Sequence, residues 1–148
     1  MYLKEIILAF LLALAYVNAQ MGTAINSGEY FILPGEKCSF IIADPNNTTY
    51  SSQDWDIKLN DGLATFKSYN KKKYATVDNY DNVVYKADPY SFQVVAAANG
   101  NGEHIVDPKS KKVWTVVPGA AAKEKGKVKL TAKKANDPHQ VFTFARVA

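Results

Sequence analysis

The chain has 148 residues, of which 47% are hydrophobic and 22% are charged, and its formal net charge is +4. This length suits one globular domain and excludes two domains of ordinary size. A single cysteine excludes an internal disulfide framework and a cysteine-based zinc cluster. Because the only two histidines lie far apart in the sequence, we expect no metal site and no cofactor.

The first nineteen residues have the pattern of an export signal rather than of a folded segment. Lys4 supplies a positive charge, residues 6–16 form an unbroken apolar run, and Val17 and Ala19 stand where a signal peptidase requires small or moderate side chains. The run is too short to span a membrane, and no later run is longer. We therefore predict a signal peptide at residues 1–19, a single domain at 20–148 and a secreted protein without a transmembrane segment. The alternative is a buried N-terminal helix.

The rest of the sequence consists of short apolar or alternating runs separated by turn residues, a pattern typical of β-strands. The runs fall into three blocks of four. The expected strands cover residues 29–33, 38–43, the polar stretch 48–51 and 55–59 in the first block, 64–69, 74–78, 82–86 and 92–95 in the second, and 104–106, 113–117, 127–132 and 141–147 in the third.

Each block ends with an aromatic residue two positions before an apolar one, which indicates an internal repeat. Three repeats are too few for a propeller. They can close a six-stranded barrel capped by a triplet of hairpins, so the predicted fold class is all-β, specifically a β-trefoil. The expected core holds the block-ending pairs Trp55 and Ile57, Phe92 and Val94, Phe142 and Phe144, together with Phe31, Leu33, Phe40, Ile42, Phe66, Val77, Val84, Val116, Val128 and Leu130.

Two blocks carry a glutamine two residues before the aromatic, in Gln53-Asp54-Trp55 and Gln140-Val141-Phe142. This spacing resembles the Gln-x-Trp signature of trefoil lectins of the ricin B type. The resemblance implies that the aromatic fills the core, that the glutamine ties the turn, and that an outward aspartate with a nearby aromatic ring grips a sugar. The candidate sugar-binding residues are Asp78, Tyr80, Asn82 and Tyr85. The alternative is that the acidic residues of this segment only build a strand-connecting turn.

Nearly the whole of residues 22–147 also resembles the trefoil serine protease inhibitors of mushrooms and related fungi. The matching segments are GEYFI at 28–32, KVWTV at 112–116, and VKL and QVFTF at 128–130 and 140–144. The resemblance implies a rigid reactive loop, which here comprises Pro45, Asn46, Asn47 and Thr48, with an asparagine in the specificity pocket of a secreted protease. Inhibition of such a protease is our main prediction, and glycan binding by a lectin is the alternative.

Two further features of the sequence bear on partners. Asn46 and Asn47 each begin an Asn-x-Thr sequon, so either is a candidate glycosylation site. Residues 103–148 carry ten basic and four acidic side chains, and residues 71–73 are three lysines. These lysines indicate either a solvated face or a third function, binding of a polyanion. Export and the absence of aromatic residues interleaved with basic ones argue against nucleic acid.

Residues for catalysis are not evident in the sequence. It contains neither a Gly-x-Ser-x-Gly elbow nor a glycine-rich phosphate loop, and Cys38 is expected to be a buried, inert thiol. We therefore predict a monomeric binding protein rather than an enzyme, with no catalytic and no metal-ligating residues.

Overall fold

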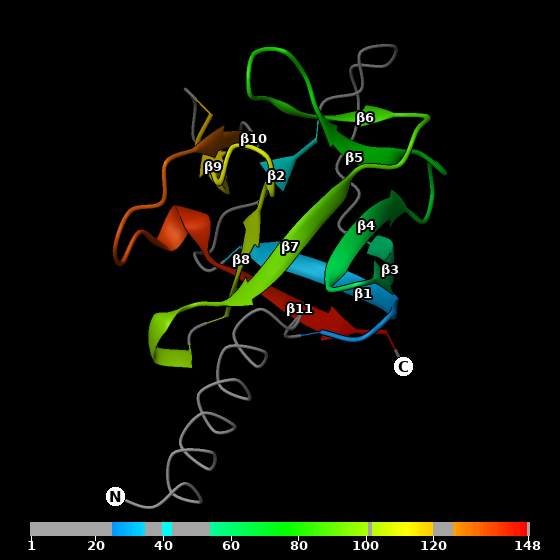
Figure 1. Cartoon of the computed structure of the whole chain (residues 1–148), viewed down its shortest axis with the longest axis horizontal. Helices are drawn as coiled ribbons and strands as arrows, with labels where there is room; N and C mark the ends of the chain where they lie inside the picture. Colours follow the sequence, from blue (N-terminus) through cyan, green and yellow to red (C-terminus); the bar gives the residue numbers. More distant parts are fainter. Residues whose placement is uncertain (1–24, 35–39, 43–53, 101, 120–125, 148) are drawn as a thin grey trace, which may run out of the picture.

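The computed structural model describes residues 25–34, 40–42, 54–100, 102–119 and 126–147, where the regular structure is β-strand apart from two short 3-10 helices (Figure 1). The predicted signal peptide at 1–19 lies outside them. Within the described residues the strands are β1 (Gly28–Pro34), β2 (Phe40–Ile41), β3 (Asp54–Asn60), β4 (Leu63–Ser68), β5 (Tyr74–Val77), β6 (Val83–Lys86), β7 (Ser91–Ala96), β8 (Glu103–Val106), β9 (Val113–Val117), β10 (Gly126–Thr131) and β11 (Phe142–Arg146). Two 3-10 helices, η1 (Ala98–Gly100) and η2 (Pro138–Gln140), precede β8 and β11.

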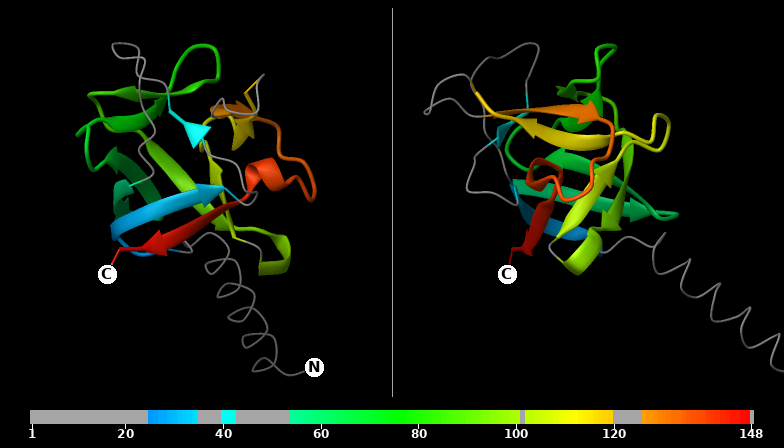
Figure 2. Two further views of the ribbon diagram at one scale, coloured as in Figure 1. Left: turned by 180° about the vertical axis from the view of Figure 1, so that it is seen from behind. Right: turned by 90° about the vertical axis from the view of Figure 1, so that its left-hand side faces the viewer.

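Six of the strands close into a barrel. Following the hydrogen-bonded neighbours from β1 leads to β3, β4, β7, β8 and β11, and β11 pairs with β1 again. Every pair in this ring is antiparallel, and β1 and β11 lie side by side in blue and red in Figure 2. The first and last strands of each predicted repeat thus form the barrel, which confirms the β-trefoil prediction and removes free barrel edges.

The remaining strands form the hairpins that cap the barrel. β5 pairs with β6 and β9 with β10, while β2 lies parallel to β10. A bridge between Asn82 and Lys129 and a hydrogen bond of 2.7 Å from the Leu130 amide to the Asp81 carbonyl join the two hairpins. The expected strand at 48–51, which would complete the third hairpin, lies outside the described residues.

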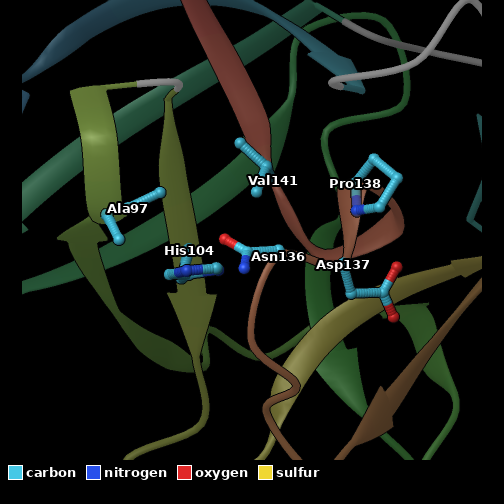
Figure 3. Close-up of a pocket in the computed structure, with 7 residues that line it drawn as sticks. Ala97, His104, Asn136, Asp137, Pro138 and Val141 are labelled. Atoms are coloured by element: carbon cyan, nitrogen blue, oxygen red, sulfur yellow. The ribbon is translucent and has the colours of Figure 1, made fainter.

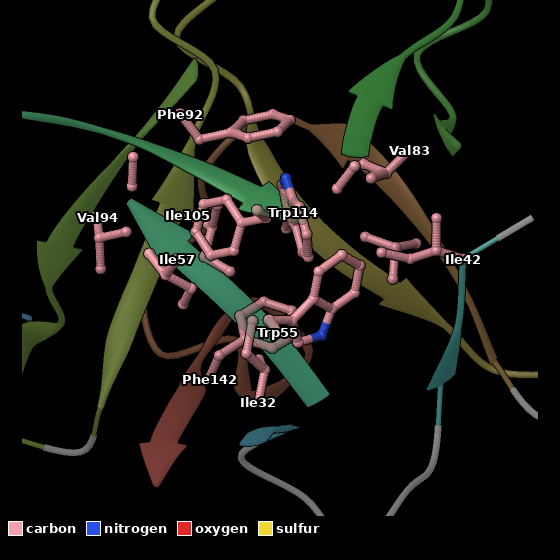
Figure 4. Packing of buried hydrophobic residues seen from close by; sticks show 14 of the residues in the cluster. Ile32, Ile42, Trp55, Ile57, Val83, Phe92, Val94, Ile105, Trp114 and Phe142 are labelled. Atoms are coloured by element: carbon pink, nitrogen blue, oxygen red, sulfur yellow. The ribbon is translucent and has the colours of Figure 1, made fainter. Parts of the chain in front are cut away.

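The core is built from large aromatic side chains at the centre of the barrel (Figure 4). Trp114 is fully buried, and its ring lies 5.3 Å from Phe92, 5.5 Å from Phe66, 6.0 Å from Phe142 and 6.5 Å from Trp55, measured between centroids. Burial of each such ring contributes about 1.5–3 kcal/mol. The three block-ending aromatics are therefore at the centre, as the repeat predicts.

The prediction of which β1 residues face the core is wrong by one position. Phe31 and Leu33 are 44% and 43% exposed, whereas Tyr30 and Ile32 are buried. Tyr30 to Leu33 are all apolar, so alternation in the sequence defines two faces without saying which one is inside. Of the other expected core residues, Val77 and Phe144 pack against the core from its edge, and the side chain of Phe40 lies outside the described part. Ile42, Phe66, Val84, Val116, Val128 and Leu130 are buried as predicted.

Helices in the described part of the chain are short. None of them is long and apolar enough to cross a membrane.

Candidate functional site

The loop at residues 78–82, between β5 and β6, is ordered by the carboxylate of Asp78. One oxygen, Oδ1, accepts hydrogen bonds of 2.8 Å from the backbone amides of Tyr80 and Asn82. The other, Oδ2, accepts a bond of 3.0 Å from the side-chain amide of Asn82. Partial burial raises the pKa of Asp78, but these hydrogen bonds, with nearby Lys86, outweigh it and hold the pKa below its ordinary value. Asp78 is therefore a fixed, ionised acceptor at neutral pH.

The ring of Tyr80 projects from this loop into solvent. It is 82% exposed, although an aromatic ring usually buries much of its surface. The loop beneath it is held to the third repeat, because Lys112 Nζ lies 2.6 Å from Asp81 Oδ2 and the Leu130 amide donates to the Asp81 carbonyl. The structure thus joins the predicted residues Asp78 and Asn82 by a side-chain hydrogen bond, and Tyr80 presents an accessible ring from the same loop.

The prediction that Tyr85 is a fourth sugar-binding residue is wrong, because its side chain is buried. It is only 1% exposed, and its ring stacks on Trp55 with a centroid separation of 5.7 Å and an interplanar angle of 26°. Lys71 Nζ lies 5.4 Å from the centroid of the same ring. Tyr85 is part of the core. Strand β6 is covered on both faces, since three consecutive residues, Val83, Val84 and Tyr85, are all buried. It has no face to offer a ligand.

The second strands of the second and third repeats carry buried threonines where the lectin resemblance implies an aspartate. Thr76 Oγ1 donates to the Val84 carbonyl at 3.0 Å. Thr115 Oγ1 lies 2.6 Å from Thr131 Oγ1, and the side-chain amide of Gln140 donates to both hydroxyls. Neither strand presents an acid to solvent, so Asp78 provides the carboxylate from the loop that follows β5.

Six of the lysines singled out in the sequence, at residues 71–73, 109, 111 and 112, lie in two equivalent turns of different repeats, whereas Lys127 and Lys129 lie on β10. In the β4–β5 turn, Lys72 Nζ lies 4.5 Å from the centroid of the Tyr69 ring. In the β8–β9 turn, Lys109 Nζ lies 5.3 Å from the Tyr90 ring, and Lys112 pairs with Asp81. Part of this positive charge is therefore engaged with rings and a carboxylate of the protein, which favours the interpretation as a solvated face.

Several predictions fall on residues that the structure does not describe. The reactive loop at Pro45, Asn46, Asn47 and Thr48, the two sequons within it, and Cys38 all lie outside the described ranges, and they stay predictions. Within the ranges that are described, no three His, Cys, Asp or Glu side chains are grouped so that they could hold a metal ion.

A pocket that the sequence does not indicate lies where the end of β7, strand β8 and the segment around η2 meet (Figure 3). Its volume is about 370 Å³. The residues that line it are Ala97, Ala98, His104, Asn136, Asp137, Pro138 and Val141, and we call it the His104 pocket. Its walls come from segments separated by about 30 residues, and no local motif marks them as neighbours.

Comparison with known proteins identifies similar folds. No family model matches the sequence, and a comparison with curated proteins finds no match. Among solved structures, a ricin B-like lectin of Macrolepiota procera in complex with lactose is 20% identical, with a TM-score of 0.67 over 84% of this chain and 100% of that one. The BEL β-trefoil is 15% identical, with a TM-score of 0.60 over 85% of this chain and 97% of that one.

A Polyporus squamosus lectin bound to the glycan Neu5Acα2-6Galβ1-4GlcNAc is 13% identical, with a TM-score of 0.56 over 82% of this chain and 50% of that one. These likenesses agree with the closed ring of strands and establish the β-trefoil fold, which the chain shares with the ricin B-like lectin of Macrolepiota procera. They do not support the protease inhibitor family specifically.

Proposed function

We propose that this protein binds carbohydrate through the loop at residues 78–82. The observation that carries the proposal is that one loop, held to the third repeat by the Lys112–Asp81 ion pair, presents both an exposed Tyr80 ring and the ionised Asp78 carboxylate. Sugar sites need such a combination, because a pyranose has an apolar C–H face and a rim of hydroxyl donors. Solved trefoils with similar folds include lectins in complex with lactose and with a sialylated glycan, which supports this choice over protease inhibition.

In this mode Tyr80 supplies the surface on which the sugar ring packs. Asp78 Oδ2 accepts one hydrogen bond from Asn82, and a carboxylate oxygen has room for a second donor, such as a sugar hydroxyl. The loop is already ordered by Asp78 and Asp81, so binding costs little conformational entropy. A single open site of this kind binds weakly. We expect a dissociation constant of about 1 mM, which corresponds to a binding free energy of about −4.1 kcal/mol.

The decisive experiment is a glycan array with the purified protein, followed by titration of any glycan retained. Tyr80→Ala is expected to weaken binding about fivefold or more, which corresponds to about 1 kcal/mol for the lost ring contact. The matched control is Tyr69→Ala, which removes another exposed tyrosine, 46% accessible, from the turn between β4 and β5. The proposal fails when the wild type retains no glycan, or when Tyr80→Ala and Tyr69→Ala bind equally well.

The proposal includes export from the cell and a binding rather than a catalytic role. Export is supported by the signal-like residues 1–19, and the binding role by the lectins among the similar folds. Protease inhibition by Pro45, Asn46, Asn47 and Thr48 stays a prediction. Incubation of the same protein with a panel of secreted serine proteases distinguishes it from glycan binding, because only an inhibitor reduces their activity.

A further inference from the structure

The His104 pocket contains a buried imidazole in a defined protonation state. His104 is only 6% exposed, and its Nδ1 lies 2.8 Å from the backbone carbonyl of Gln140. A carbonyl only accepts, so Nδ1 carries the proton and donates it. Burial and the positive charge of Lys133 together hold the pKa of His104 below its ordinary value. The ring is therefore neutral at pH 7, and Nε2 has a free lone pair.

No partner for Nε2 is found within the described ranges, where the only hydrogen bond of His104 is the one to Gln140. Although the side chain as a whole is buried, Nε2 itself is accessible from the pocket rather than sealed in the core. Because the imidazole lines the His104 pocket, a molecule in the pocket is positioned to supply the missing donor.

The other walls narrow the chemistry of such a molecule. The Asn136 side chain extends toward His104 across the pocket, while the Asp137 carboxylate points away (Figure 3). That carboxylate is already occupied, because it accepts from the His139 amide at 3.0 Å and faces His139 Nδ1 at 3.1 Å. Ala97, Pro138 and Val141 complete the lining with apolar surface. The pocket therefore offers the Nε2 acceptor of His104, the side-chain amide of Asn136 and apolar surface, and this combination suits a neutral molecule with hydroxyl groups.

We propose that the His104 pocket is a second binding site. Its ligand is a neutral polyhydroxylated ring of monosaccharide size, one hydroxyl of which donates a hydrogen bond to Nε2 of His104 while the ring packs against Pro138 and Val141. A volume of about 370 Å³ lies within the range of small-molecule sites. None of the lining residues belongs to the loop at 78–82, so this site can be tested independently of the proposed Tyr80 site.

The test follows the ring nitrogens of both histidines by NMR of the ¹⁵N-labelled protein. Because the chain has two histidines, the variant His139→Gln assigns their signals. The probes are the methyl glycosides of galactose, glucose, mannose and N-acetylglucosamine, with inorganic phosphate and acetate as anionic probes. At least one neutral glycoside is expected to shift the Nε2 signal of His104 in a saturable manner, whereas the anions leave it unchanged.

Variants then locate the site. Asn136→Gly removes the amide at a position with φ of 57°, which glycine adopts readily, and is expected to weaken binding about fivefold to tenfold. Lys111→Gly is the matched control, because Lys111 has φ of 64° in the β8–β9 turn, outside the pocket, and its affinity is expected to equal that of the wild type. Tyr80→Ala is likewise expected to leave the His104 shift intact.

Three results overturn the proposal. The first is that none of the neutral glycosides shifts the Nε2 signal of His104. The second is that phosphate or acetate shifts this signal and the glycosides do not. The third is that the Asn136→Gly variant binds a glycoside as tightly as the wild type does. A glycan bound at Tyr80 with no His104 shift leaves the proposed function standing and removes only this inference.

Discussion

At the scale of single residues, Gln140 shows how one side chain joins separate parts of the third repeat. It is fully buried, and its amide donates to Thr115 Oγ1 at 3.2 Å, Thr131 Oγ1 at 3.1 Å and the Ala132 carbonyl at 2.9 Å. Its Oε1 accepts from the Lys134 amide at 2.8 Å. The expectation that this glutamine ties the turn is thereby confirmed, with two amide protons shared among three acceptors.

Gln140→Ala is predicted to lower the free energy of unfolding by about 1–3 kcal/mol, because the Lys134 amide and the Ala132 carbonyl lose their partner. Urea denaturation followed by tryptophan fluorescence measures the loss. Gln140→Glu is the sharper comparison, since an ionised carboxylate keeps the acceptor but cannot donate to a carbonyl. A Gln140→Glu variant as stable as the wild type would show that the amide donors contribute nothing.

Other single residues show where sequence patterns stop being informative. Gln140 is predictable because the Gln-x-aromatic spacing has one structural meaning. Phe31 and Leu33 are mispredicted because every side chain from 30 to 33 is apolar, so the hydrophobic effect alone does not select a face. Tyr85 is mispredicted because a short cap strand is covered on both sides, and an aromatic there fills the core rather than serving a ligand.

At the scale of elements, the β4–β5 and β8–β9 turns have the same hydrogen bonds despite different sequences. The amides of Lys72 and Lys111 donate to the carbonyls of Ser68 and Asp107 at 2.9 and 2.8 Å. The Ser68 hydroxyl accepts from the Lys71 amide, and the equivalent Asp107 carboxylate accepts from Ser110. This equivalence shows in backbone geometry that the second and third repeats share a turn, although their sequences there differ.

The equivalence predicts the outcome of substitutions at Asp107. Its carboxylate is buried and accepts a bond of 2.6 Å from the Tyr90 hydroxyl, which together with burial raises the pKa of Tyr90 to about 12. Asp107→Ala is predicted to lower the free energy of unfolding by about 2–3 kcal/mol. Asp107→Ser recreates the hydroxyl acceptor of Ser68 and is predicted to lose less.

Ultraviolet titration of the tyrosines provides an independent check on the same variants. With Asp107 replaced, the pKa of Tyr90 is expected to fall toward 10, because the negative charge and the hydrogen bond that hold its proton are gone. Equal stability of the Ala and Ser variants would contradict the structural equivalence of the two turns. An unchanged Tyr90 titration would contradict the role of Asp107.

The strands themselves were predictable for a simple reason. Period-two alternation and turn residues marked ten of the eleven described strands to within one residue at each end, and the eleventh, β2, is described over Phe40–Ile41, inside the predicted range 38–43. Closure of the barrel followed from counting repeats. The His104 pocket could not be predicted from the sequence. Its walls come together only when β7, β8 and the segment around η2 pack against one another, and no local sequence pattern indicates that these segments are neighbours.

At the scale of the whole molecule, the closed ring of strands explains how the fold is stabilised without disulfides. Strands β1 and β11, at opposite ends of the described chain, pair over five positions from Tyr30↔Arg146 to Pro34↔Phe142. This pairing brings the ends of the described chain together around one aromatic core. Local opening anywhere in the barrel exposes that core, so unfolding is expected to be cooperative and pH effects at single sites to act on the entire domain.

The last prediction is a loss of stability in mild acid that originates at His104. Because burial and Lys133 lower its pKa from 6.5, the unfolded chain takes up a proton before the folded one does. Stability is therefore fully present above about pH 6.5 and declines as the pH falls below it. Glu29 and Glu103, whose pKa values are raised from 4.5 chiefly by burial, act in the opposite direction and add stability as the pH falls.

Urea midpoints of the wild type and of a His104 variant, compared between about pH 7 and about pH 5.5, isolate the His104 effect, because both proteins keep Glu29 and Glu103, and Asp78 and Asp107 have pKa values lowered from 3.8. The wild type is expected to lose stability steadily across this window. His104→Asn keeps an amide donor near the position of Nδ1 for the Gln140 carbonyl but has no proton to gain, so its midpoint is expected to be lower at pH 7 and to vary less. A wild-type midpoint that does not change with pH, or an equal slope in both proteins, would show that His104 is protonated as easily in the fold as outside it.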